Sequence, residues 1–226
     1  MIKLSIASLS AALLLSAIPT AAAPIVIAPS DVTASSELGL NFTRIDDQIV
    51  DGSGLTGGFH TSDNPNLTMW LSTGSGNFGG VDLDPFVIFD LGDFYTVTSF
   101  RVWNYNELAG VSTNLTNRGV NQVSVEYGET AALGSTVAGI SNFAQADGTD
   151  TYTGEAFDST GLIADASAIT AFNARYIKFD IDSNYGDGNT FYGLSEVQFS
   201  GTLVPEPSSL ALLGLGGLLI ARRRRG

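Results

Sequence analysis

The chain contains no cysteine and a single histidine among its 226 residues. The absence of cysteine excludes a disulfide scaffold and every zinc or iron–sulfur site built on thiolates. Because His60 is the only histidine, a metal site that needs two histidines is excluded as well. The sequence also lacks a Gly-x-Ser-x-Gly nucleophile motif, a His-Glu-x-x-His zinc motif and a phosphate-binding Gly-Lys-Ser/Thr loop. We therefore predict that the chain is not an enzyme.

Positive charge is scarce in the interior of the chain. Positions 24–203 hold five basic residues against 22 acidic ones, a difference of −17. An acidic surface repels phosphate backbones, so we do not expect nucleic acid to be a partner. The same surface suits divalent cations, which prefer oxygen ligands, or neutral ligands.

The N-terminal segment has the pattern of a secretory signal peptide. Lys3 precedes an apolar run over residues 4–18, and small residues follow up to Ala23. This order of a positive start, a short apolar core and small residues is typical of export signals. The sequence predicts a signal peptide over residues 1–23, with cleavage after Ala22 or Ala23.

The C-terminal segment combines three features in a fixed order. Pro205-Glu206-Pro207 precedes an apolar stretch over residues 210–221, and four arginines follow at 222–225. The stretch is shorter than the roughly 20 residues of a comfortable transmembrane helix, and the arginines favour a cytoplasmic end. The pattern resembles the PEP-CTERM sorting signal of Gram-negative bacteria. For residues 204–226 the resemblance implies transient inner-membrane anchoring, processing by an exosortase, and release to the cell surface or biofilm matrix.

Between these two segments, residues 24–203 predict one all-β domain. Residues 175–181 alternate, so Ile177, Phe179 and Ile181 share an apolar face and we expect Phe179 to be buried. Further strands are expected over 86–91, 96–105, 123–127 and 194–201, with Leu91-Gly92-Asp93 as a turn between the first two. Residues 163–174 are the one interior stretch that favours a helix.

Short motifs in this domain follow the order found in the discoidin family, also called the factor V/VIII type C domain. The motifs are Ala34-Ser35-Ser36, Asp51-Gly52, Phe86 to Gly92, Val102-Trp103-Asn104-Tyr105-Asn106, Arg118-Gly119-Val120, residues 174–179, and Gly193 to Phe199. The resemblance implies a jelly-roll β-sandwich of the galactose-binding type, with ligand loops at one end. The chain departs from the pattern in an insertion over residues 57–68 and in a long polar stretch up to Thr160.

The resemblance also implies a structural calcium site. Calcium takes six to eight oxygen ligands, many of them backbone carbonyls. In the sugar-binding members of the family, the corresponding ligands surround an Asp-Gly turn and a Glu of the last strand. In this chain they map onto the carbonyls of Gln48, Ser53 and Ser195, the carboxylates of Asp51 and Glu196, and Thr56. The alternative is that Asp51 only closes a turn and Glu196 is solvated. We expect the acidic loops at Asp82–Asp84 and Asp182–Asp187 to be solvated turns.

For a sugar ligand, aromatic rings offer stacking surfaces and amide or guanidinium groups bind hydroxyls. The candidates are Trp70, Tyr185 and Tyr192 for stacking, and Asn104, Asn106 and Arg118 for hydrogen bonds. We expect His60 to have a structural role. The leading hypothesis is an exported module that binds carbohydrate or exopolysaccharide. A structural matrix component without a specific pocket and a small extracellular polymer hydrolase remain alternatives.

Overall fold

The computed structural model describes residues 22–39, 42–109 and 113–205. Its strands are β1 (Ala23–Ile25), β2 (Val32–Ala34), β3 (Leu55–Thr56), β4 (Phe59–His60), β5 (Trp70–Leu71), β6 (Phe86–Asn104), β7 (Leu108–Ala109), β8 (Thr113–Asn114), β9 (Val123–Gly128), β10 (Ser135–Thr136), β11 (Glu155–Asp158), β12 (Ser167–Ala168), β13 (Phe172–Ile181) and β14 (Gly193–Leu203). Four short 3-10 helices join them: η1 (Pro29–Asp31), η2 (Asp46–Ile49), η3 (Pro65–Leu67) and η4 (Thr116–Arg118). The described ranges contain no α-helix, which confirms the all-β prediction. Most of the predicted signal peptide and sorting segment, residues 1–21 and 206–226, lies outside the described residues, whereas Ala23 belongs to β1.

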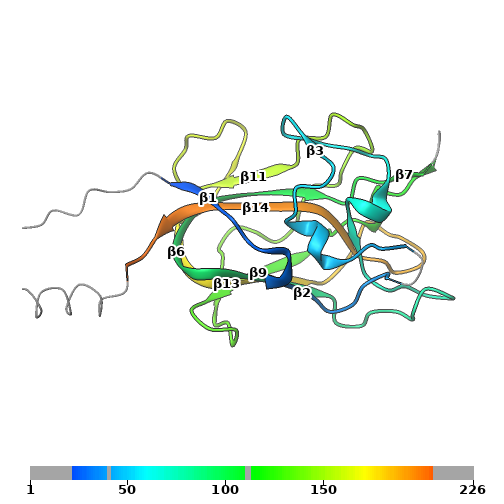
Figure 1. The fold of residues 1–226 in the computed structure, drawn as a ribbon, viewed down its shortest axis with the longest axis horizontal. Coiled ribbons are helices and arrows are strands. Elements are labelled where there is room, and N and C mark those ends of the chain that lie inside the picture. Colours follow the sequence, from blue (N-terminus) through cyan, green and yellow to red (C-terminus); the bar gives the residue numbers. More distant parts are fainter. Residues whose placement is uncertain (1–21, 40–41, 110–112, 206–226) are drawn as a thin grey trace, which may run out of the picture.

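Strand β6 joins the two layers of the sandwich. Its first half pairs with β2 and β13, and its second half pairs with β14 and β11. Figure 1 shows β14 and β11 in one layer and β13, β9 and β2 in the other, with β6 bending between them. The expected turn at Leu91-Gly92-Asp93 is therefore wrong as a strand end. Gly92 adopts a left-handed φ of 80°, which only glycine reaches without steric cost, and the strand continues through it.

The space between the layers is filled by aromatic and β-branched side chains. Phe179 is fully buried, as its place in the alternating strand predicts, and β13 pairs with β9 so that Phe179 lies opposite Val125. The Phe179 ring packs edge-on against Phe89 and Phe143, each with its centroid 5.1 Å away. The two-layer architecture with this shared core is the predicted jelly-roll sandwich.

The helix expected over residues 163–174 is absent. Residues Ser167–Ala168 form β12, which pairs with β11 in parallel, and β13 begins at Phe172. Phe172 and Ala174 are buried while Asn173 between them is exposed, which is the two-residue period of a strand. The local composition favoured a helix, but burial on the sheet decides the conformation.

The two ends of the sandwich are built differently: the first and last strands pair at one end, and loops form the other. β1 pairs with the last residues of β14, Ala23 opposite Gly201, so the first and last strands meet at one end. At the other end, β14 begins beside the connections that follow β6 and β13, through bridges of Gly119 with Gly193 and of Val120 with Asn184. We call this second end, formed by residues 105–109, 113–119 and 182–192 with residues 42–44 and 74–78, the loop end.

Candidate functional site

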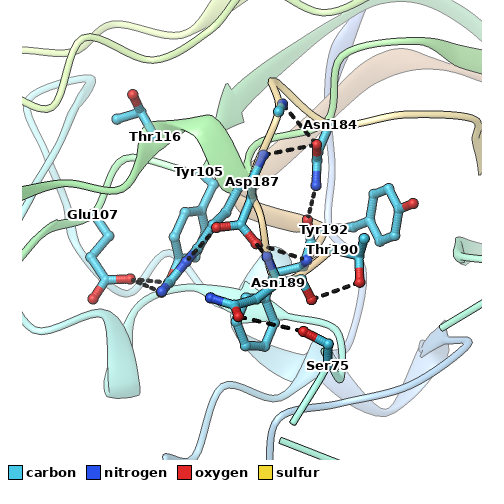
Figure 2. Close-up of polar contacts among 12 residues, drawn as sticks. Ser75, Tyr105, Glu107, Thr116, Asn184, Asp187, Asn189, Thr190 and Tyr192 are labelled. Atoms are coloured by element: carbon cyan, nitrogen blue, oxygen red, sulfur yellow. Dashed lines mark hydrogen bonds and ion pairs between the residues drawn. The ribbon is translucent and has the colours of Figure 1, made fainter. Parts of the chain in front are cut away.

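Arg118 lies at the centre of the loop end, at the last position of η4. Its Nη1 donates to Glu107 Oε2 at 3.1 Å, and its Nε lies 3.7 Å from Asp187 Oδ1. The guanidinium also lies over the Phe191 ring, 4.8 Å from its centroid. Glu107 and Asp187, which make these contacts, come from two separate segments of the loop end (Figure 2). Two carboxylates and one aromatic ring therefore hold the Arg118 head group in place while 15% of its side chain stays exposed.

A second arginine fixes Glu107 from behind. Arg44 donates through Nη1 and Nη2 to the two carboxylate oxygens of Glu107, at 2.9 and 3.2 Å. The buried Tyr105 hydroxyl accepts from Arg44 and donates to Glu107. Burial, followed by the negative charge of Glu107, raises the pKa of Tyr105 well above its usual value, so this phenol stays protonated. Arg44, Tyr105 and Glu107 are thus all bonded to one another.

The loop between β13 and β14 is folded around two polar side chains. Asp187 Oδ2 accepts the backbone N–H groups of Asn189 at 3.0 Å and Phe191 at 3.2 Å. Asn184 Oδ1 accepts from Gly186, and Asn184 Nδ2 donates to the Phe191 carbonyl at 2.8 Å. Figure 2 shows Asp187 with its carboxylate directed into this loop. The expectation of a solvated turn is wrong for Asp187, which is 9% exposed and anchors the loop beside Arg118.

An aromatic strip continues the loop end away from Arg118. Phe191 packs edge-on against Phe78 with a centroid distance of 5.3 Å, and Phe78 packs against Phe42 at 6.1 Å. Arg44 lies over the Phe42 ring at 5.6 Å. Phe191 is buried, whereas Phe42 and Phe78 are partly exposed. The loop end thus has an apolar surface next to a set of polar groups.

Two polar side chains of the loop end, Arg118 and Asn189, are incompletely or weakly hydrogen-bonded. Among the described residues, Arg118 Nε has no hydrogen-bond partner, although its atom is buried beside Asp187. The exposed Asn189 contacts Ser75 through Oδ1 at 3.4 Å, a weak bond at the rim (Figure 2). Fixed donors and acceptors beside aromatic rings are the usual lining of a small-molecule site.

Two of the residues assigned to calcium, Asp51 and Glu196, come together where an early turn contacts β14. Gly52 N–H donates to Glu196 Oε2 at 3.2 Å, so the Asp51-Gly52 turn lies against the last strand. Asp51, Gly52 and Glu196 line one cavity of about 290 Å³. Glu196 is 1% exposed, and burial, with a smaller contribution from the charge of Asp51, raises its pKa to about 8. A buried carboxylate beside a second one is the arrangement that a divalent cation would stabilise.

The other residues assigned to calcium differ in exposure and in hydrogen bonding. Ser53 Oγ and Gln48 Oε1 are buried without a hydrogen-bond partner in the described part of the chain. Thr56 is exposed in β3, and Ser195 is fully buried in β14. No group of three or more histidines and carboxylates that could hold a metal occurs within residues 22–39, 42–109 and 113–205. The buried, partnerless oxygens of Ser53 and Gln48 would suit an ion that takes neutral oxygen ligands, as calcium does.

The fold is shared with solved carbohydrate-binding structures. A CBM32 module of a family 31 glycoside hydrolase from Clostridium perfringens matches with a TM-score of 0.50 and 15% identity, covering 79% of this chain and 96% of that one. A fucose-binding module of Streptococcus pneumoniae matches with a TM-score of 0.50 and 11% identity, covering 78% and 96%. The described domain has the CBM32/discoidin-like fold.

A second match to known proteins concerns the C-terminal segment. Residues 203–225 match the PEP-CTERM protein-sorting motif. The chain carries a C-terminal sorting signal of exported proteins. In the part of the chain that is described, no helix is long and apolar enough to cross a membrane. No curated protein matches the chain. A truncated AlyQ with CBM32 and alginate lyase domains matches with a TM-score of 0.45 and 20% identity; the match covers 84% of this chain and 36% of that longer one.

Within this CBM32-like fold, three predicted ligand residues are buried. Trp70 is fully buried and its Nε1 donates to the Ser36 carbonyl at 3.0 Å, so the ring cannot stack on a sugar. Asn104 is 1% exposed, and its side chain bonds to Val120 through both Oδ1 and Nδ2. Asn106 is fully buried, with its Nδ2 donating to the Thr149 carbonyl at 2.8 Å. These side chains hold the CBM32-like frame together, which corrects their assignment to ligand binding.

The remaining predicted ligand residues keep some exposure. Arg118 lies at the loop end, as described above. Tyr185 is half-buried, and its hydroxyl donates to the Phe143 carbonyl. Tyr192 is half-buried as well, and Figure 2 shows its hydroxyl pointing away from Asp187. Sequence reasoning missed Arg44, Phe42 and Phe78 as members of this end.

His60 has a structural place, as expected from its isolation. Its ring is fully buried, its Nδ1 lies 2.8 Å from the Thr61 carbonyl, and burial lowers its pKa. Its backbone N–H donates to the Tyr152 carbonyl at 2.9 Å. The inserted hairpin of β3 and β4 is thereby tied to the loop before β11.

Proposed function

We propose that the chain is an exported carbohydrate-binding module whose loop end binds the glycan. The observation that carries this proposal is Arg118, which is held by Glu107 and Asp187 and remains partly exposed beside the aromatic strip. Hydroxyl groups of a sugar need donors and acceptors in fixed positions, and the C–H face of a sugar packs on aromatic rings. The loop end offers both within one small area.

The charges of the loop end favour a neutral glycan. Arg44 and Arg118 are balanced by Glu107 and Asp187, so the cluster carries no net charge. The domain as a whole has an acidic excess of 17 residues over positions 24–203. An acidic polymer would meet repulsion from the surface without a compensating cation at the site. We infer that neutral exopolysaccharide is bound in preference to polymers of uronic acids.

The sorting motif supports delivery of this module to the outside of the cell. We propose that a signal peptide directs export, that the segment after Leu203 anchors the chain briefly in the inner membrane, and that an exosortase releases it. The start of β1 and the end of β14 lie together at the end opposite the loop end (Figure 1). The loop end therefore lies opposite the paired ends of β1 and β14.

We propose further that calcium occupies the site of Asp51 and Glu196 and has a structural role. Support comes from the contact between the Asp51-Gly52 turn and Glu196, and from the burial of the Glu196 carboxylate. Bound calcium would supply positive charge there and join an early loop to the last strand. Asp51, Glu196 and the carbonyls of Gln48, Ser53 and Ser195, together with Thr56, would hold the ion.

A glycan array tests the binding function. The full-length protein is applied to neutral and uronic acid polymers, as wild type and as the Arg118→Gln and Arg175→Gln variants. Arg175 is the matched control, because it lies on β13, pairs with Asp90 of β6 and has a side chain that is 42% exposed. We expect saturable binding to a neutral glycan that is lost only in Arg118→Gln. An absence of saturable binding to any glycan would refute the proposal and favour the structural matrix alternative.

A further inference from the structure

We propose that the outer face of the β14–β6–β11 layer carries a second glycan site, separate from the loop end. Two adjoining cavities of about 380 and 450 Å³ lie on this face. Both are lined by Arg101 and Thr153, so they form one cleft that crosses the sheet; we call it the outer cleft. β3 and β11 both lie along this side of the molecule in Figure 1. None of the residues of the loop-end network lines the outer cleft.

The floor of the outer cleft is a stack of Arg101 on Trp103. The Arg101 guanidinium lies 5.7 Å from the centroid of the Trp103 ring, which is 3% exposed. Arg101 Nη1 donates to the Thr153 carbonyl at 2.8 Å, and Trp103 Nε1 donates to the Gly58 carbonyl at 3.2 Å. Arg101 Nε and Nη2 make no hydrogen bond to any described residue. The guanidinium is thus fixed in position with donors available for hydroxyl groups.

An exposed aromatic ring stands at one side of this floor. Phe59 lines the cleft, is 42% exposed, and belongs to the inserted hairpin β3–β4. The turn of the hairpin is Gly57-Gly58, with φ values of 61° and 88° that side chains rarely adopt. The insertion thereby places a large apolar ring at the surface beside Arg101. The ring gives the cleft an apolar wall on which the C–H face of a sugar could pack.

Hydrogen-bond acceptors stand at the other side of the floor. Glu155 and Asp165 line the second cavity. Glu155 uses Oε2 to accept the Ala144 N–H at 2.8 Å, and Oε1 has no partner in the described ranges. Together, Arg101, Glu155 and Asp165 amount to one positive and two negative charges. This balance disfavours a polyanion and suits a hydroxyl-rich neutral chain.

The shape of the outer cleft fits an extended ligand. Its lining includes Gln198 of β14, Arg101 of β6 and Glu155 of β11, three strands in succession. At about 4.8 Å between neighbouring strands, the cleft is roughly 10 Å across. A neutral polysaccharide chain laid across the strands would meet Phe59 first, then Arg101, then the two carboxylates. A chain with two such sites could join two polymer strands or bind one strand with higher avidity.

The test is a calorimetric titration of the full-length protein with neutral hexasaccharides of glucose, galactose and N-acetylglucosamine. The variants are Phe59→Ala and Arg101→Gln for the outer cleft, Arg118→Gln for the loop end, and Leu162→Ala as control. Leu162 is 87% exposed and does not line the cleft, so its truncation removes a comparable apolar surface elsewhere. Thermal unfolding of each variant shows whether it is folded.

We expect two hexasaccharides per wild-type chain. Phe59→Ala and Arg101→Gln should each weaken one of the two binding events about tenfold, which corresponds to about 1.4 kcal/mol. Arg118→Gln should remove the other event, and Leu162→Ala should change neither. One hexasaccharide per chain with an affinity that Phe59→Ala and Arg101→Gln leave unchanged would overturn the outer cleft while the loop end stands. Binding that survives Arg118→Gln but is lost in Phe59→Ala would support the outer cleft and refute the loop end. No binding to any hexasaccharide would refute both.

Discussion

Truncation of Phe179 is the sharpest perturbation of the sandwich core. The side chain is fully buried, and its ring contacts Phe89 and Phe143 at 5.1 Å and Phe100 at 6.3 Å. Replacing a buried phenylalanine by alanine costs about 3–5 kcal/mol, because transfer energy is lost and a cavity remains. Edge-on aromatic contacts add about 0.5–1.5 kcal/mol per pair. We therefore expect Phe179→Ala to lower the free energy of unfolding by about 4–5 kcal/mol.

The assay is denaturant unfolding of the full-length protein, with the midpoint and the slope fitted separately. Lys178→Ala is the control, since Lys178 directly precedes Phe179 in the same strand and pairs with Asp180 at the surface. A surface ion pair contributes about 0–1 kcal/mol, so this variant should remain near the wild type. A loss below about 1 kcal/mol for Phe179→Ala, or a loss equal to that of Lys178→Ala, would refute the assignment of the buried face.

Three further predictions concern the metal, a titrating carboxyl and a buried ring. Free calcium at 100 times its dissociation constant should stabilise the fold by about 2.7 kcal/mol. In thermal unfolding, Glu196→Gln should lose this gain and Asp187→Asn should keep it. Equal unfolding midpoints of the wild type with calcium and with chelator would exclude the site. Burial and the neighbouring Asp46 carboxyl raise the pKa of Glu37 to about 7. The folded state keeps a proton there that the unfolded chain releases near pH 4.5, so this contribution to stability is lost as the pH rises towards 7. Glu37→Gln should flatten that decline in a series of melting temperatures, and an unchanged slope would contradict it. Trp70→Phe removes the hydrogen bond from the buried indole to the partly buried Ser36 carbonyl, and it should cost about 1–3 kcal/mol while glycan affinity stays the same. A lower affinity in the folded variant would show that Trp70 takes part in ligand binding.

The strands could be predicted because their side chains alternate between core and solvent. The expected strand over residues 175–181 lies within β13, and the one over 123–127 lies within β9. The prediction was wrong at Gly92, because a glycine is compatible both with a turn between two strands and with a bend inside one long strand. The distinction depends on the pairing of β6 with both layers, which is a long-range property.

The loop end was harder to predict, because its members are distant in sequence. Arg44 and Glu107 are 63 residues apart, and nothing local to either residue indicates the contact. Asn104 and Asn106 were plausible sugar ligands by residue type, yet their amides join loops inside the frame. Arg118 was identified by its place in a family motif, but its partner Asp187 is in a loop whose composition indicates a solvated turn.

The central claim is that a glycan binds beside Arg118 at the loop end. The most direct measurement is a crystal structure of the full-length protein with the neutral glycan that binds best on the array. We predict a sugar within hydrogen-bonding distance of Arg118, with one face against Phe78. A sugar found only on another surface, with solvent at Arg118, would contradict the account.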